Sequence, residues 1–140
     1  MAAQLLIYPQ TDVSGLCVNE QENSHFPSRT ENADGYFTTL SLERWCADHY
    51  LADEKSSFDW RVSPLRAGSL VGVAPAVVCT AQFDPLRDEG EVYADALSAA
   101  GVTTCRHHGL GMIHGYLRWV TPHLLHGLKR LVCVQFSNCC

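Results

Sequence analysis

The 140-residue sequence has no run of about 18 apolar residues, so we expect no membrane-spanning helix. Its first residues lack the basic region and the long apolar stretch of a signal peptide, which makes a cytoplasmic location the expectation. Basic side chains are also few, because 10 Lys and Arg stand against 15 Asp and Glu and give a net charge of −5. This acidic balance argues against nucleic acid or an anionic membrane surface as a partner.

Metal-binding and disulfide patterns are absent as well. The seven cysteines are odd in number and irregularly spaced, and no C-x-x-C occurs. We therefore expect reduced, structural cysteines, no metal ion and no cofactor. His123 and His126 lie three residues apart in a predicted helix, but the sequence suggests no third ligand.

What is present is an alternation of strands and helices. Apolar runs predict strands at residues 5–8, 74–83 and 102–107. Helical periodicity predicts helices at residues 41–51, 88–100 and 116–131. Asp88 is the predicted N-cap of the middle helix, with Glu91 in capping-box spacing, and Gly101 is its predicted C′ residue. The polar stretch 10–37 predicts a long loop.

The first of these helices is predicted from the helical spacing of Leu42, Trp45, Cys46 and His49. In the second, the residues Tyr93, Ala96, Leu97 and Ala100 form a stripe that we expect to be buried. Trp45 of the first helix is expected in the core. Tyr50, Trp60 and Trp119 are also expected in the core, although Trp60 and Trp119 could instead line a substrate pocket.

Alternating strands and helices predict a parallel sheet, whose functional sites lie at the carboxyl ends of its strands. Asp84 follows the strand at 74–83, and His114 lies in a glycine-flanked loop beyond the next strand. The separation, 114 − 84 = 30 residues, fits one βαβ unit. The two side chains can therefore meet across neighbouring strand ends.

An acid beside a histidine is two-thirds of a Ser-His-acid triad, in which the carboxylate orients the imidazole that serves as general base. The alternative interpretation is that Asp84 only caps a helix and that His114 is an ordinary loop histidine. Spacing and topology alone leave both open. The third member is missing, since no G-x-S-x-G occurs, and Ser14 and Ser63 lie in contexts that do not form a nucleophile elbow.

Five segments occurring in one order carry a family resemblance. They are residues 5–9 with 11–12, residues 31–37, residues 63–65, residues 84–88 (DPLRD) and residues 113–116 (IHGY). Together they resemble the carboxyl-terminal half of α/β-hydrolases of the hormone-sensitive lipase group, which includes microbial carboxylesterases and arylacetamide deacetylase. The resemblance implies an α/β fold, with about three parallel strands alternating with about three helices, over a partial domain at residues 1–132. Residues 133–140 form a cysteine-containing tail that resembles nothing in the family.

The resemblance also implies that Asp84 is the triad acid, that His114 is the base, and that the substrates are small carboxylic esters cleaved as by an esterase or lipase. The family's nucleophile elbow and its H-G-G-G-type oxyanion segment, which precede the matched region, do not occur in these 140 residues. Two hypotheses remain. The chain is an ester hydrolase whose serine is supplied upstream, or it is an inactive fragment or pseudoenzyme that acts at most by binding. An unpaired sheet edge would favour self-association in either case.

Overall fold

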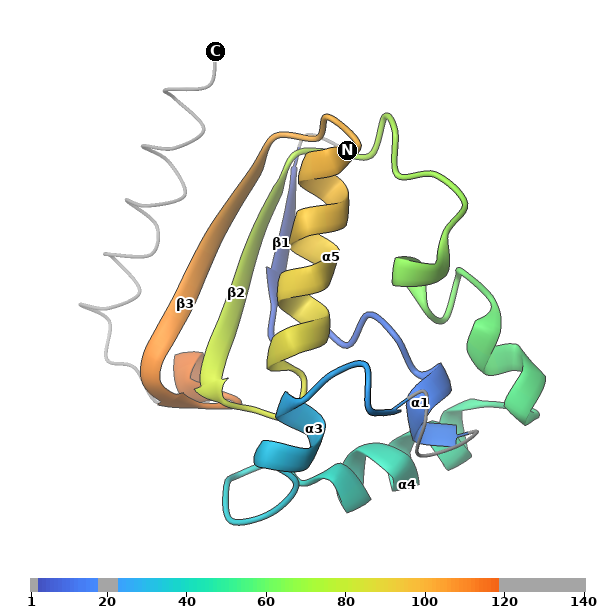
Figure 1. The fold of residues 1–140 in the computed structure, drawn as a ribbon, viewed down its shortest axis with the longest axis vertical. Helices are drawn as coiled ribbons and strands as arrows, with labels where there is room; N and C mark the ends of the chain where they lie inside the picture. The colour runs from blue at the N-terminus through green and yellow to red at the C-terminus, as the bar shows by residue number, and fades with distance from the viewer. Residues whose placement is uncertain (1–2, 18–22, 119–140) are drawn as a thin grey trace.

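The computed structural model describes residues 3–17 and 23–118, and its centre is a three-stranded parallel sheet (Figure 1). The strands are β1 (Gln4–Ile7), β2 (Ala76–Phe83) and β3 (Thr104–Ile113), in the order β1-β2-β3. This confirms the predicted strands and their parallel pairing. β3 continues past the predicted end at residue 107, because it stays paired with the full length of β2 through an irregularity near Ala81.

The core lies between the sheet and helix α5 (Arg87–Ala99), which covers one face of the sheet (Figure 1). The six residues of β2 from Ala76 to Ala81 are all buried, as expected of a strand with neighbours on both sides. Val78 packs there against Tyr93 and Leu97 of the helix, both from the predicted stripe. Gly101 follows the helix with a φ of 77°, which confirms it as the C′ residue.

The predicted N-cap of α5 is wrong. The helix begins at Arg87, and Leu86 is its N-cap residue. Just before the helix, the Asp84 carboxylate accepts a hydrogen bond from the Leu86 N–H at 2.9 Å. The Asp88 carboxylate accepts a hydrogen bond from the backbone N–H of Ser28. The predicted capping-box residue, Glu91, instead accepts from the hydroxyl of Thr80 on β2. Tertiary partners thus displaced the local capping pattern.

Helix α4 (Leu40–Tyr50) is confirmed, but the predicted burial of Trp45 and Tyr50 is wrong. Leu42 and Trp45 are 45% and 58% exposed, and only Ala47 is buried, packed against Val13 and Leu16. Cys46, His49 and Tyr50 are exposed as well, and so is Trp60, which was also predicted in the core. The helix therefore buries Ala47 in a small apolar cluster, around which Leu40, Leu51 and Val62 are partly buried.

The predicted loop at 10–37 is also wrong over its described part, which contains the short helices α1 (Ser14–Cys17) and α3 (Ser28–Glu31). The Arg29 side chain is fully buried and pairs with the equally buried carboxylate of Glu89 on α5. Arg29 also donates to the Asp12 carbonyl, and the Thr11 N–H donates to Glu89 Oε1 at 2.7 Å. A buried ion pair therefore fastens this polar segment to the main helix. Glu89, which also follows the expected preference for acids in a first helical turn, has this second role.

The remaining described elements are short. They are the 3₁₀ helices η1 (Glu54–Phe58), η2 (Pro64–Arg66) and η3 (Tyr116–Arg118). Cys79 is buried, Cys105 is half-buried and Cys46 is exposed, and all three are free thiols. The predicted helix at 116–131 begins with η3, and the rest of it, with Trp119, His123, His126 and the tail at 133–140, lies outside the described residues.

We expect Arg29→Met to lower the free energy of unfolding by about 3–5 kcal/mol, because it removes one partner of a buried ion pair. The double variant Arg29→Met/Glu89→Leu should lose less than the sum of the two single variants. Urea denaturation followed by circular dichroism measures all three. Arg61→Met is the control, since the Arg61–Asp59 pair lies at the surface and should contribute nothing measurable. Strict additivity of the buried pair would contradict the prediction.

Candidate active site

Asp84 lies immediately after β2 and is 1% exposed. Its two carboxylate oxygens have different partners. Oδ1 accepts the Leu86 N–H, and Oδ2 lies 2.8 Å from Nδ1 of His114. One oxygen of Asp84 thus faces the start of α5 while the other faces the histidine, so Asp84 does more than cap the helix, and its role as a triad acid stays a prediction.

His114 follows β3 directly and is carried by a turn in which Gly115 has a φ of 82°. A positive φ is unfavourable for other residues, so glycine lets the chain turn sharply at this point. Because an ionised carboxylate can only accept, His114 Nδ1 donates to Asp84, and Nε2 is left as the basic nitrogen. The imidazole side chain is 24% exposed, so this nitrogen belongs to a group within reach of solvent.

The surroundings of His114 act on its pKa in opposite directions. Burial lowers the pKa by disfavouring the imidazolium, while the hydrogen bond and charge of Asp84 raise it, and the charge of Glu43 adds to the rise. The net result is a pKa above the ordinary 6.5. Glu43 lies on α4, where it accepts hydrogen bonds from Gln10 at 3.1 Å and Thr38 at 2.8 Å.

A group of polar residues that the sequence did not identify supports the Asp84 turn. Ser28 Oγ donates to the Pro85 carbonyl at 2.8 Å and accepts the Asp88 N–H. Asn32 Nδ2 donates to the Asp84 carbonyl at 3.3 Å. These residues come from the segment predicted as a loop, and Figure 1 shows α3 lying against the carboxyl end of the sheet. Their polarity in the sequence resembled that of an exposed loop, so no local signal distinguished them.

The two serines considered as nucleophiles are held in structural hydrogen bonds. Ser14 is fully buried, and its hydroxyl donates to Asp12 Oδ1 at 2.6 Å. Ser63 is also fully buried, and its hydroxyl donates to the Ser57 carbonyl while accepting the Val13 N–H. Neither arrangement resembles the exposed serine of a nucleophile elbow.

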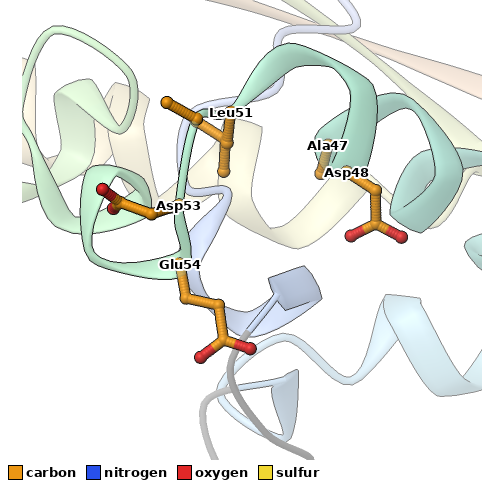
Figure 2. Close-up of a pocket in the computed structure, with 6 residues that line it drawn as sticks. Ala47, Asp48, Leu51, Asp53 and Glu54 are labelled. Atoms are coloured by element: carbon orange, nitrogen blue, oxygen red, sulfur yellow. The ribbon is translucent and has the colours of Figure 1, made fainter.

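A hollow lies between the end of α4 and η1, and neither Asp84 nor His114 lines it (Figure 2). It is lined by Asp48, Asp53 and Glu54 together with small and apolar side chains. Asp53 is the N-cap of η1, since its carboxylate accepts the Ser56 N–H at 2.8 Å. Figure 2 shows the carboxylates of Asp48 and Asp53 pointing in different directions. Over residues 3–17 and 23–118, no three His, Cys, Asp or Glu side chains are grouped to hold a metal ion.

A parallel sheet with an aspartate and a histidine in contact at its carboxyl edge is the arrangement expected of an α/β-hydrolase. A family model described as an alpha/beta hydrolase fold matches residues 1–118. The chain therefore belongs to the α/β-hydrolase fold-3 family, the group resembling hormone-sensitive lipase. In the described part of the chain, no helix is long and apolar enough to cross a membrane.

Similar proteins include several esterases. The chain is 39% identical to the carboxylic ester hydrolase LipN of Mycobacterium tuberculosis, over 81% of this chain and 28% of LipN. It is 44% identical to a thermostable esterase from Pseudomonas putida ECU1011, with a TM-score of 0.72 over 82% of this chain and 34% of that one. A structure from an analysis of two fungal esterases of Rhizomucor miehei shares 33% identity and a TM-score of 0.81, over 98% of this chain and 41% of that one. The chain thus spans less than half the length of each.

We expect Asp84→Asn to lower the pKa of His114, because asparagine can still accept the Leu86 N–H but carries no charge to stabilise the imidazolium. Titration of the imidazole resonances by nuclear magnetic resonance measures the change. The resonances of His107, which lies on β3, provide the internal control. An unchanged His114 pKa in the variant would show that the 2.8 Å contact is not formed in solution.

Since the folded protein binds the His114 proton more tightly than the unfolded chain does, the contribution of this pair to stability is complete below pH 6.5. It is lost as the pH rises through the raised pKa of the folded state. Asp84→Asn should therefore reduce the pH dependence of the urea midpoint above pH 6.5.

Proposed function

We propose that this chain supplies the acid and the base of an ester hydrolase, with Asp84 orienting His114 and His114 activating a serine. The 2.8 Å contact between Asp84 Oδ2 and His114 Nδ1 carries this proposal. The esterase activity named for the similar proteins supports it. The substrate would be a small carboxylic ester, and the serine and the oxyanion-stabilising donors would come from polypeptide outside these 140 residues.

The chemistry follows from the tautomer that Asp84 selects. Nε2 of His114 would take the proton from the serine hydroxyl as that oxygen attacks the ester carbonyl, and would then give the proton to the departing alcohol. Asp84 would stabilise the imidazolium formed between these steps. Water would repeat the sequence on the acyl-enzyme, with Nε2 again as base, and release the carboxylic acid.

The proposal can be tested by joining the chain to the portion of the Pseudomonas putida esterase that precedes the matched region. The isolated chain should not hydrolyse a short-chain aryl ester, while the hybrid should. In the hybrid, His114→Ala should reduce kcat by up to about 10⁶-fold, and Asp84→Asn by about 10⁴-fold. His107→Ala is the matched control on the same strand and should retain activity.

The pH profile of the hybrid gives an independent check. General-base action needs a neutral imidazole, so kcat/KM should rise with pH through the pKa of His114, which lies above 6.5. An active hybrid in which His114→Ala and His107→Ala behave alike would exclude His114 as the base. A folded hybrid without any turnover would favour the alternative, a pseudoenzyme that acts at most by binding.

We also propose that the 140-residue chain self-associates through β1, which is an edge strand of the described sheet and exposes Leu5 by 52% and Ile7 by 39%. An exposed, apolar edge strand can pair with a second copy. Ile7→Lys should shift the sedimentation pattern toward monomer, and Val71→Lys, at a 75% exposed loop position, should not. A monomer at all concentrations would contradict this prediction. The cytoplasmic location and the partial domain at 1–132 stay predictions.

A further inference from the structure

Tyr8 has an unusual backbone conformation at the end of β1. Its φ of 48° is the only positive value among the non-glycine residues of the described segments. The residue precedes Pro9, which further restricts its backbone. The Tyr8 N–H still donates to the Cys79 carbonyl at 2.8 Å, so the strand pairing continues to this point. A strained residue held by its surroundings is a candidate for a functional role.

The side chain of Tyr8 is directed at the turn that carries His114. Its ring centroid lies 4.8 Å from that of the His114 imidazole and 5.1 Å from that of Tyr116. Its hydroxyl oxygen accepts the backbone N–H of Leu117 at 2.5 Å. Burial raises the pKa of Tyr8 to about 12, outweighing the opposite effect of the Leu117 hydrogen bond. The phenol is therefore neutral at physiological pH.

We propose that Tyr8 is a positioning residue for His114, with its ring packed against the imidazole and its hydroxyl fastening the Gly115–Leu117 turn to the end of β1. This inference rests on the proposed role of His114 as the base. It adds the end of β1 to a site whose other two residues, Asp84 and His114, follow β2 and β3. The chain segments joined by the hydroxyl are 109 residues apart in sequence.

The physical need for such a residue follows from the geometry of the turn. One hydrogen bond from Nδ1 to Asp84 fixes a single point of the imidazole and leaves the ring able to pivot. Gly115 gives the backbone beside it freedom that a larger residue would restrict. The Tyr8 ring beside the imidazole restricts the pivoting of that ring. The hydrogen bond from the Leu117 N–H to the Tyr8 hydroxyl restricts the backbone of the turn after Gly115. The charges that act on the imidazole, those of Asp84 and Glu43, are unaffected by this uncharged residue.

The test is Tyr8→Phe in the 140-residue chain, which removes the hydroxyl but keeps the ring. Hydrogen exchange at the Leu117 amide should become about ten-fold faster, as expected for the loss of one hydrogen bond. The pKa of His114 should fall, because the imidazolium spends less time bonded to Asp84. Tyr8→Leu, which also removes the ring contact, should lower that pKa further. Nuclear magnetic resonance measures both quantities.

Tyr116→Phe is the matched control, because the Tyr116 hydroxyl is buried in the same cluster and has no hydrogen-bond partner among the described residues. It should leave both quantities unchanged. If the Leu117 amide of Tyr8→Phe exchanges as slowly as in the wild-type chain, the proposal that the Tyr8 hydroxyl holds the turn is overturned. Faster exchange with an unchanged His114 pKa would overturn the positioning role and leave a structural one.

The double variant Asp84→Asn/Tyr8→Phe separates this inference from the proposed function. If Tyr8 acts through the Asp84–His114 contact, the hydroxyl should have no further effect on the His114 pKa once the Asp84 charge is gone. A pKa fall of equal size in both backgrounds would overturn that route. If Asp84→Asn alone leaves the pKa unchanged, the acid–base pair fails, whereas the Leu117 exchange still reports on the Tyr8 tether.

Discussion

The buried ion pair between Arg29 and Glu89 is the interaction on which the carboxyl edge of the sheet depends. Both side chains are fully buried, and burial raises the pKa of Glu89 to about 7 against the opposing effects of Arg29 and the Thr11 N–H. Two charged groups removed from water must satisfy each other, so the segment carrying Arg29 cannot leave α5 without a large cost. That segment also carries Ser28 and Asn32, which bind the turn around Asp84. The ion pair is therefore connected to the site through the backbone of α3.

Asp84 shows how a single side chain can link fold and site. The oxygen that accepts the Leu86 N–H belongs to the start of α5, and the oxygen beside His114 belongs to the candidate active site. The carboxylate is almost completely buried, so its orientation is set by these two partners rather than by solvent. A helix that moved relative to β2 would carry the histidine's partner with it. Packing of α5 on the sheet therefore helps to set the geometry of the contact between Asp84 and His114.

The described strands contribute unequally to the site, and their order in the sheet explains how. β2 is central and is followed by Asp84, and β3 lies beside it and is followed by His114. β1 lies on the other side of β2, and Tyr8, which directly follows it, packs its ring against the histidine. The edge position leaves Leu5 and Ile7 of β1 exposed. At the carboxyl end of the strand, the Tyr8 N–H still donates a hydrogen bond to the Cys79 carbonyl of β2.

The sequence by itself determined the alternation of elements, the central apolar strand and the acid and histidine at strand ends, because strand burial and topology leave marks in local composition and spacing. It did not determine which helix face is buried or which polar residues lie inside. α4 carries Trp45 outward and Ala47 inward, and Arg29 is buried in a stretch that resembles a solvated loop. Such choices depend on partners far away in the chain, as Glu89 is for Arg29 and Leu117 is for Tyr8. Only the tertiary structure decided them, since a buried charge or a strained backbone is stable only beside the particular groups that compensate for it.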